Sequence, residues 1–389
     1  MKILVYTSDY PSPTEPDRGV FVYNLIQKFV LLGHQVTVIV PYSKLKNYLK
    51  SEKVNGYGQE RARVYRLSTL STSAKRIGKY NTYQIGEYFT VKKLQKLVKE
   101  TGQDYDFIYA HFLTNGIIAV KALSHLNIPI FVAMGESNLD DRISLIPARE
   151  LEGLMQRITG FVVVAYHLKE KLLSLGVEEN RIGVYPNGVD LKKFHKMDQV
   201  EARLKLGIGR QEKVLVFVGR FLPHKGPDRV IEAIEKIDKD VKLILIGKGD
   251  MELNYKGILF KGAIPSHLVP LYLNAADIFI LPTLREGASN AIVEAMACGL
   301  PIISSDIPEV KEQCRPSFSR LVDPLDVDKI AESIEELLYD EALLKKMSES
   351  ALMHSAHFDI DQRAENILEF ISQKCNSEKL FVEDSSSID

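Results

Sequence analysis

Short apolar runs recur along most of the chain, and segments with apolar positions three and four residues apart lie between them. Strands of a parallel sheet are buried on both faces, so they appear as continuous apolar runs, whereas the spacing of three and four is typical of helices. The predicted strands of the first half are Ile3–Tyr6, Val36–Val40, Arg63–Leu67, Phe107–Ala110, Ile130–Ala133, Gly160–Ala165 and Arg181–Tyr185. Those of the second half are Lys213–Val218, Lys242–Ile246, Ile258–Lys261, Ala276–Leu281 and Ile302–Ser304. The predicted helices are Val20–Leu32, Tyr88–Lys99, Pro227–Ile237, Asn290–Cys298, Val327–Tyr339, Ala342–Ser355 and Ile360–Ser372.

This alternation of strand and helix predicts an α/β protein with two doubly wound, Rossmann-like domains. We assign residues 1–185 to the N-terminal domain and residues 186–357 to the C-terminal domain. The segment 186–190, Pro-Asn-Gly-Val-Asp, stands between them, and its Asn-Gly turn signal makes it a hinge candidate. Ligands of such sheets bind beyond the carboxyl ends of the strands, so candidate chemistry is expected in the loops that follow the strands.

The stretch 281–306 predicts a strand, a loop, a helix and a second strand, with Glu286 in the loop and Glu294 in the helix. The amides of residues 288–290 stand at a helix N-terminus, where an anion is favoured, and Gly287 allows close backbone approach. Glu294 lies about 7–8 Å further along the helix axis, roughly the distance from a diphosphate to a ribose. The stretch therefore favours a phosphorylated sugar, although solvated surface carboxylates are the alternative. The candidate binding residues here are Gly287, Ala288, Ser289, Asn290 and Glu294.

Two further loops carry candidate side chains. Arg220 and Lys225 stand five residues apart in the loop after the first strand of the second domain. Arg grips phosphate bidentately and Lys acts as a mobile point charge, so the pair favours a phosphate group over two merely solvated cations. His111 sits at the carboxyl end of the predicted strand Phe107–Ala110, and a role in capping or packing is the alternative to a catalytic one.

Together these motifs resemble the retaining glycosyltransferases of family 4, whose signature is a pair of glutamates separated by seven residues. The resemblance implies the GT-B fold, in which two Rossmann-like domains enclose an active-site cleft. It also implies that the last helix, residues 358–373, crosses back onto the N-terminal domain, leaving residues 374–389 as a tail. The residues that carry the resemblance are Glu286, Glu294, Ala295, Gly299, Pro301, the segment 186–190 with Phe194, and the loop 219–226.

Roles for individual residues follow from the resemblance. Arg220 and Lys225 would hold the donor diphosphate and stabilise it as it leaves, Glu286 would position the donor sugar, and Glu294 would hold the ribose. The substrate-binding set includes Gly219 at the start of the cation loop, Gly247 in a glycine turn near the nucleotide, Ile264 against the base, and Gly19 facing the donor phosphates and the acceptor.

Met134 departs from the family pattern, because many relatives have a histidine at this position that interacts with the transferred sugar. Glu136, Ser137 or His111 would then make the polar contact instead. The catalytic candidates are accordingly Glu286, Arg220, Lys225 and His111, and Glu136 joins the substrate-binding set.

The overall composition is that of a soluble globular protein, with 389 residues, 45% apolar residues and a formal net charge of −1. Its three cysteines have no metal or disulfide spacing, which favours a reducing compartment. The N-terminal apolar run is too short for a signal peptide, and no run approaches the ~20 residues of a membrane span. The predicted localisation is cytoplasmic, peripheral at the inner face of the membrane.

Positive charge is concentrated between Lys44 and Lys99, where fourteen Lys and Arg residues stand against three acids. A patch facing anionic lipid or an anionic acceptor is one interpretation, and a solvated region is the other. No nucleic-acid-binding motif accompanies the charge, so nucleic acid is not a predicted partner.

The sequence thus predicts a retaining glycosyltransferase that moves a sugar from a nucleotide-diphosphate donor to a glycan or lipid-linked hydroxyl acceptor, without a metal or other cofactor. Such an enzyme would serve cell-surface polysaccharide or glycolipid assembly. The alternatives are a GT-B epimerase or phosphorylase, and a non-catalytic protein that binds sugar nucleotides.

Overall fold

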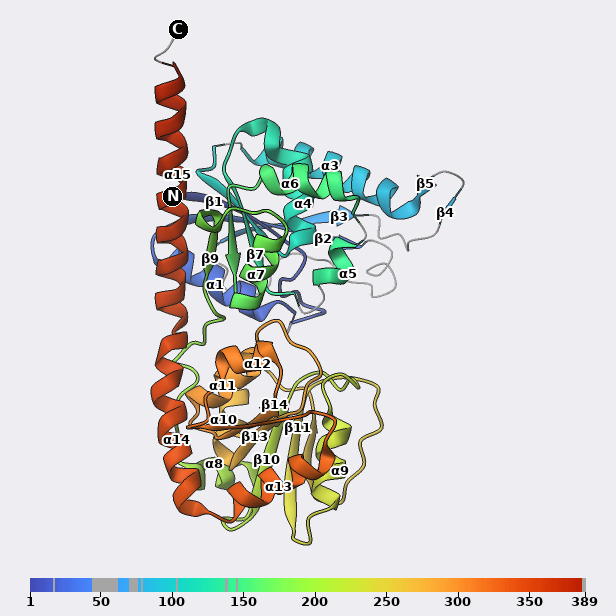
Figure 1. Ribbon diagram of the computed structural model, residues 1–389, viewed down its shortest axis with the longest axis vertical. Coiled ribbons are helices and arrows are strands. Elements are labelled where there is room, and N and C mark those ends of the chain that lie inside the picture. Colours follow the sequence, from blue (N-terminus) through green and yellow to red (C-terminus); the bar gives the residue numbers. More distant parts are fainter. Residues whose placement is uncertain are drawn as a thin grey trace. The chain divides into compact units, whose positions relative to one another are not determined.

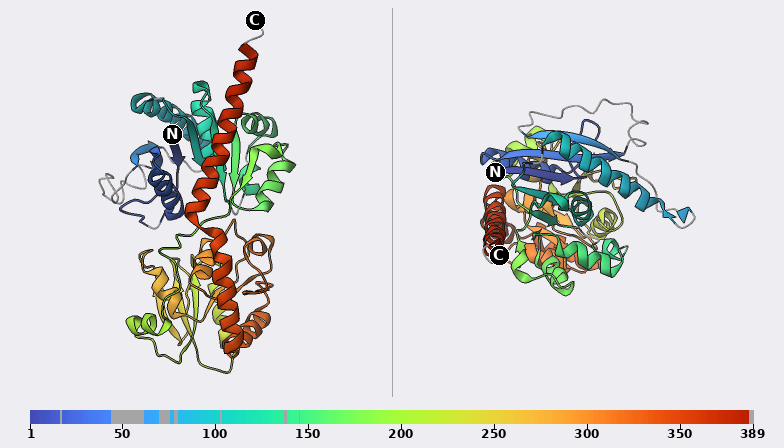
Figure 2. Two further views of the ribbon diagram at one scale, coloured as in Figure 1. Left: turned by 90° about the vertical axis from the view of Figure 1, so that its left-hand side faces the viewer. Right: turned by 90° about the horizontal axis from the view of Figure 1, so that it is seen from above.

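The computed structural model describes residues 1–16, 18–43, 62–69, 76–77, 80–102, 104–136, 139–144 and 146–386. The chain forms two compact units, which are described separately below and drawn in Figures 1 and 2. The first unit comprises Met1–Tyr185 and Ala364–Asp389, and the second comprises Pro186–Arg363.

A seven-stranded parallel sheet forms the centre of the first unit, with the strand order β3-β2-β1-β6-β7-β8-β9 (Figure 1). Strands β6, β7 and β8 are buried at every position, which requires cover on both faces and explains their continuous apolar sequence. The strands are β1 (Lys2–Thr7), β2 (Gln35–Ser43), β3 (Arg63–Thr69), β6 (Phe107–His111), β7 (Ile130–Met134), β8 (Gly160–Val163) and β9 (Ile182–Val184).

Helices lie between consecutive strands along the chain, as the prediction of a doubly wound parallel sheet requires. A short antiparallel hairpin, β4 (Arg76–Ile77) with β5 (Tyr80–Asn81), precedes the longest of the connecting helices. Among the described residues, the helices between these strands are α1 (Val20–Leu31), α3 (Thr82–Thr101), α4 (Leu113–Leu123), α5 (Leu139–Ile143), α6 (Ala148–Gln156) and α7 (Tyr166–Ser174), with single 3-10 turns at Ser124–Leu126 and Glu179–Arg181.

The last helix, α15 (Ile360–Ser386), completes the core of the first unit. Ala364, Ile367, Leu368 and Ile371 are buried at the spacing of one helix face, and the Phe370 ring lies 6.3 Å from that of Phe131. The helix does not end at residue 373, where we expected a tail to begin. It continues to Ser386, because residues 374–386 contain neither glycine nor proline to stop it.

A six-stranded parallel sheet, in the order β12-β11-β10-β13-β14-β15, forms the centre of the second unit. The edge strand β15 is absent from the sequence prediction, because its Ser-Arg-Leu-Val sequence is only partly buried and lacks a continuous apolar run. The strands are β10 (Lys213–Val218), β11 (Val241–Ile246), β12 (Ile258–Gly262), β13 (Ile278–Leu281), β14 (Ile302–Ser305) and β15 (Ser319–Val322). The helices are α8 (Gln199–Leu206), α9 (Pro227–Glu235), α10 (Val269–Ala275), α11 (Asn290–Ala297), α12 (Pro308–Gln313), α13 (Val327–Leu338) and α14 (Glu341–Ser355), with a 3-10 turn at Ala356–Phe358.

The strand order reverses between β10 and β13, which are neighbours in this sheet. From β10 the chain winds outward through β11 and β12, and it then returns to β13 and winds the other way. The loops that leave β10 and β13 therefore diverge at one point of the carboxyl edge, the usual ligand position of an open α/β sheet. The predicted α/β architecture with two parallel sheets is confirmed. None of the helices in the described part of the chain combines the length and apolar composition that crossing a membrane requires.

Candidate active site

The loops after β10 and β13 are tied together at the point where the strand order reverses. The backbone amide of Leu284 donates to the His224 carbonyl at 2.7 Å, and the Thr283 hydroxyl donates to the same oxygen at 3.2 Å. The sequence prediction placed Lys225 in one loop and Glu286 in the other, 61 residues apart. The tertiary fold thus brings the two predicted segments together.

Lys225 and Glu286 form an ion pair between their Nζ and Oε1 atoms. Both side chains are largely buried, because the Glu286 side chain is 9% exposed and that of Lys225 is 17% exposed. A buried carboxylate is costly unless a cation and hydrogen bonds compensate it. Lys225 supplies that compensation, and its charge is therefore partly used within the protein.

Cations from the loops after β10 and β13 and from helix α9 act on His224. Burial lowers the pKa of the His224 imidazole, and the charges of Lys225, Arg285, Arg220 and Arg229 lower it further. Arg220 is exposed, so its guanidinium can reach a ligand. Arg229 has a structural role, because its two terminal nitrogens donate to the carbonyls of Pro223, at 2.9 Å, and Pro282, at 2.7 Å. The loop is therefore electropositive and favours an anion.

The glycine turns after β10 and β11 approach each other too closely for any side chain. A Cβ on Gly247 would lie 1.8 Å from the Gly219 carbonyl oxygen, and the Gly219 amide donates to Ile246 at 2.9 Å. The Gly247 amide in turn donates to Gly262 at 2.9 Å, next to the half-buried Ile264. Packing therefore requires a glycine at position 247, so the presence of Gly247 alone does not argue for a ligand.

The start of helix α11 differs in detail from the prediction. The Ser289 amide does not point freely towards a ligand, because it donates to the Gln313 Oε1 atom at 2.8 Å, and the Gln313 amide returns a bond to the Ser289 carbonyl. Asn290 is more informative, because its buried Oδ1 atom has no hydrogen-bond partner among the described residues. A buried acceptor without a donor is unfavourable, so this atom is well suited to a ligand that donates.

Glu294 is half-buried, and it interacts electrostatically with a cation that the sequence analysis missed. Burial raises the pKa of the Glu294 carboxyl to about 7, while the charge of Lys193 acts in the opposite direction. Burial also lowers the pKa of the Lys193 ammonium. Lys193 lies just after the segment 186–190. Within that segment, the Asn187 side-chain amide donates to the Ala288 carbonyl at 3.1 Å. The only sequence signal for this partnership was the position of Lys193 next to Phe194.

His111 lies at the carboxyl end of β6 in the first unit and is 5% exposed. Its ring packs against those of Phe112 and Phe21, with centroid separations of 4.5 Å and 5.4 Å. Phe112 has a φ of +74°, which L-residues rarely adopt, and the Asn115 amide donates to the His111 carbonyl at 2.6 Å. A strained backbone that is held in place by hydrogen bonds is common at functional sites.

Glu136 holds this strained turn. Its Oε1 atom accepts from the Leu113 amide at 2.5 Å, and its Oε2 atom accepts from the Gly135 amide at 3.0 Å. The carboxylate thus caps the N-terminus of α4, where negative charge is favourable. Met134 is fully buried, so it is a core residue. Ser137, the remaining alternative for the polar contact, lies outside the described residues.

Gly19 is the N-cap residue of α1, with a φ of +64°. A Cβ there would lie 2.3 Å from the backbone of Asp9, so the loop before α1 can pack only against glycine. Arg18 closes the same loop through ion pairs of 3.2 Å to Asp9 and to Glu15. The predicted role of Gly19 as a substrate contact stays a prediction.

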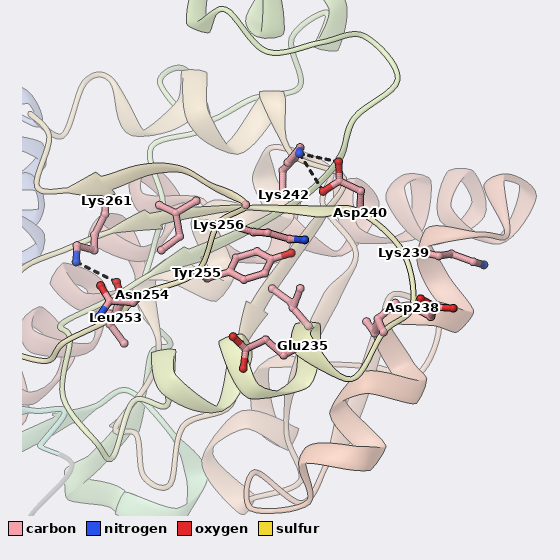
Figure 3. A pocket seen from close by; sticks show the side chains of 14 residues that line it. Glu235, Asp238, Lys239, Asp240, Lys242, Leu253, Asn254, Tyr255, Lys256 and Lys261 are labelled. Atoms are coloured by element: carbon pink, nitrogen blue, oxygen red, sulfur yellow. Dashed lines mark hydrogen bonds and ion pairs between the residues drawn. The ribbon is translucent and has the colours of Figure 1, made fainter.

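A large pocket of about 1300 Å³ lies at the opposite edge of the second sheet, beside the amino ends of β11 and β12 (Figure 3). Its charged side chains have both signs, and Lys242 pairs with Asp240 at 2.7 Å. No residue of the predicted site lines this pocket. Among the residues that the structure describes, no cluster of three or more His, Cys, Asp or Glu side chains could hold a metal ion.

Comparisons with known proteins agree with this architecture. Residues 19–193 match the family model Glycosyltransferase Family 4, and residues 198–353 match the model Glycosyl transferases group 1. A protein of Bacillus subtilis, named as a teichuronic acid biosynthesis glycosyltransferase, is 28% identical over 86% of this chain and 88% of its own length. The Escherichia coli UDP-Gal:alpha-D-GlcNAc-diphosphoundecaprenol alpha-1,3-galactosyltransferase is 29% identical over 64% of this chain and 70% of its own.

The solved structure of Anabaena HepE in complex with UDP superposes with a TM-score of 0.75 at 19% identity, over 96% of this chain and all of that one. The fold is therefore of the GT-B type, with two Rossmann-like domains built on parallel sheets. Since the two family models together span nearly all of the chain from residue 19 to residue 353, the protein is a GT-B glycosyltransferase.

Proposed function

We propose that this protein transfers a sugar from a nucleotide-diphosphate donor to a hydroxyl acceptor with retention of the anomeric configuration. The observation that carries the proposal is the pairing of Lys225 with Glu286 in a buried, electropositive loop cluster where the strand order reverses. The pair places a carboxylate, which can accept from sugar hydroxyls, next to cations, which can bind a diphosphate. The half-buried Glu294 lies on the helix that follows the same loop.

The difficult step is the departure of a nucleoside diphosphate from the anomeric carbon. In the proposed mechanism Arg220 and Lys225 neutralise the charge that develops on the leaving phosphate, a preorganised electrostatic contribution. The bond between the anomeric carbon and the phosphate oxygen breaks, and the acceptor oxygen bonds on the same face. The leaving phosphate takes the acceptor proton, so the step needs neither a covalent enzyme intermediate nor a metal.

The other predicted residues bind and orient the donor. Glu286 accepts from hydroxyls of the donor sugar, and Glu294 accepts from the two ribose hydroxyls. Asn290 offers its unsatisfied acceptor, and Ile264 packs against the base. His111 contributes a polar contact to the transferred sugar from the first unit, in place of the histidine that many relatives have at the position of Met134.

The names of related proteins suggest the classes of donor and acceptor. HepE was solved with UDP, and the Escherichia coli relative is named for a UDP-sugar donor and a diphosphoundecaprenol-linked acceptor. We therefore propose a nucleotide-sugar donor and a glycan or lipid-linked acceptor, used in cell-surface polysaccharide or glycolipid assembly. The corresponding location is cytoplasmic, at the inner face of the membrane.

A thermal-shift screen of nucleotide sugars should identify the donor, because a ligand that binds only the folded protein raises its melting temperature. With that donor and an acceptor, the anomeric configuration of the product is read by NMR. A retained configuration supports the proposal, and inversion contradicts it. Epimerised donor, phosphate-dependent cleavage of a glycan, or donor binding without any turnover would favour the respective alternatives.

Two variants test the division between the carboxylates. Glu286→Gln should lower turnover strongly while the affinity for the free nucleoside diphosphate stays nearly unchanged, because this carboxylate addresses the sugar. Glu294→Gln should mainly weaken nucleoside diphosphate binding, because a charged acceptor for ribose is lost. Equal losses of nucleotide affinity in both variants would contradict the assignment.

A further inference from the structure

One exposed face of helix α3 carries apolar and basic side chains in a single stripe. Its apolar members are Ile85, Tyr88 and Phe89, whose exposed fractions are 40%, 59% and 44%. Lys92, Lys96 and Lys99 continue the stripe, and all three are exposed. Relative to residue 85 these positions are offset by 3, 4, 7, 11 and 14 residues, which keeps them on one side of a helix with 3.6 residues per turn. We call this set the α3 stripe.

The opposite side of α3 is fixed to the first unit, so the stripe faces outward. Gly86, Thr90, Leu94 and Val98 are buried at intervals of four residues. The Gln95 amide donates to the Ala122 carbonyl at 3.1 Å, on the neighbouring helix α4. Helix α3 lies as a long rod along the outside of this unit in Figure 1.

The charges on α3 are sorted between its two sides. Lys93 points away from the stripe, because its Nζ atom donates to the Ser68 carbonyl of β3 at 2.6 Å. Glu87 is likewise removed from the stripe by an ion pair with Lys121 of α4. At the far end Lys96 lies 3.8 Å from Glu100, at the margin of the stripe. The exposed stripe is therefore basic at one end and apolar at the other.

We propose that the α3 stripe docks the protein on a bilayer that contains anionic lipid. Aromatic side chains with one polar end, such as Tyr88, are favoured at the level of the lipid headgroups, and Ile85 and Phe89 offer apolar surface to the acyl boundary. Lys92, Lys96 and Lys99 match the phosphates of anionic headgroups, with their stems along the apolar surface. The ammonium of Lys92 lies 5.8 Å from the Tyr88 ring, so the two halves of the stripe adjoin.

A membrane fits this stripe better than a folded protein partner does. It is a convex helix face rather than a groove, and it combines a few apolar side chains with lysines, which are depleted in protein interfaces. Docking through the α3 stripe rests on the membrane location in the proposed function, and it does not depend on the chemistry of sugar transfer.

The test measures binding of the full chain to sedimented vesicles, without any donor. Vesicles with about a third anionic lipid should pellet the protein at low salt, and neutral vesicles should not. Each lysine near the surface contributes about fivefold to binding, so Lys92→Glu, Lys96→Glu and Lys99→Glu together should reduce binding by about a hundredfold or more. Raising the salt to about 0.5 M should release the wild-type protein, because the Debye length falls.

A second variant, Tyr88→Ser with Phe89→Ser, isolates the apolar half. It should weaken binding to anionic vesicles at low salt and should leave less protein bound at intermediate salt than the wild type. The matched controls lie on the second unit: Lys205→Glu, Lys345→Glu and Lys346→Glu change three exposed lysines there, and Leu204→Ser with Met353→Ser changes side chains that are 77% and 71% exposed.

Binding that falls in the stripe variants and not in the controls supports the proposal. Equal binding by the stripe and control variants would overturn it, and so would equal, negligible pelleting of the wild type with both vesicle types. If the wild type is a dimer in lipid-free solution and the Tyr88→Ser, Phe89→Ser variant is a monomer, the stripe is an interface with a second copy of the chain, and the membrane proposal is overturned. Donor affinity is measured separately without vesicles, so a failure of the docking surface is distinguished from a failure of the transferase.

Discussion

Replacing Glu294 by glutamine should stabilise the protein at pH 8 and do so much less at pH 5. Glutamine has nearly the shape of a protonated glutamate and carries no charge, so it removes the cost of a desolvated carboxylate. The pKa of Glu294 is raised by burial to about 7, from 4.5 for an exposed glutamate. The ionised carboxylate is therefore unfavourable in the folded state, and Glu294 of the folded protein is ionised mainly above neutral pH.

The sign and size of the effect follow from this shift. Between pH 4.5 and pH 7 the folded state binds more protons at Glu294 than the unfolded chain does, so stability falls as the pH rises through this window. At 1.36 kcal/mol per pKa unit, the loss approaches about 3 kcal/mol above pH 7. Lys193 loses its attraction to Glu294 in the variant, so we expect a net gain of about 1–3 kcal/mol at pH 8. Each kcal/mol corresponds to about 2–4 °C in the melting temperature of a domain of this size.

Melting temperatures of wild type and variant are compared from pH 5 to pH 8, with Glu232→Gln as the control. Glu232 is exposed on α9 of the same unit, so its variant should show no such trend. The affinity of Glu294→Gln for the nucleoside diphosphate should fall by about ten- to a hundredfold, the value of a hydrogen bond to a charged acceptor. A stability difference that does not change with pH, or a variant that is less stable at pH 8, would refute the reasoning.

Three further predictions concern the remaining site. Arg220→Ala and Lys225→Ala should each lower turnover about a hundredfold. Only Lys225→Ala should also lower the melting temperature, because it leaves the buried Glu286 unpaired. Normal turnover in both variants would refute the diphosphate assignment. Glu136→Ala should lower the free energy of unfolding by about 1–3 kcal/mol, because two amides lose their acceptor. It should also lower kcat without changing the nucleoside diphosphate affinity, because the turn at His111 loosens. A loss of nucleotide affinity would contradict this account. Treatment with EDTA should leave the rate unchanged, whereas complete inactivation would require a metal that the proposed mechanism does not use.

The sequence alone determined the elements that have a strong local signal. Continuous apolar runs marked most of the parallel strands, because a strand with helices on both faces has no polar side. The same reasoning placed Arg220, Lys225, Glu286 and Glu294 in loops or helices that follow strands. It failed at β15, whose polar edge sequence gives no such signal, and at the end of α15, where no residue stops the helix.

The partners of these side chains were decided by the tertiary structure. Lys225 meets Glu286 only because β10 and β13 are neighbours where the strand order reverses, and strand order is not written in local patterns. For the same reason the pairing of Ser289 with Gln313 could not be foreseen. The basic region between Lys44 and Lys99 is a second example. Its net positive charge was visible in the sequence. Only the packing of α3 showed that Lys93 turns inward to β3 while Lys92 stands in an exposed stripe, since burial on one helix face fixes what the other face presents.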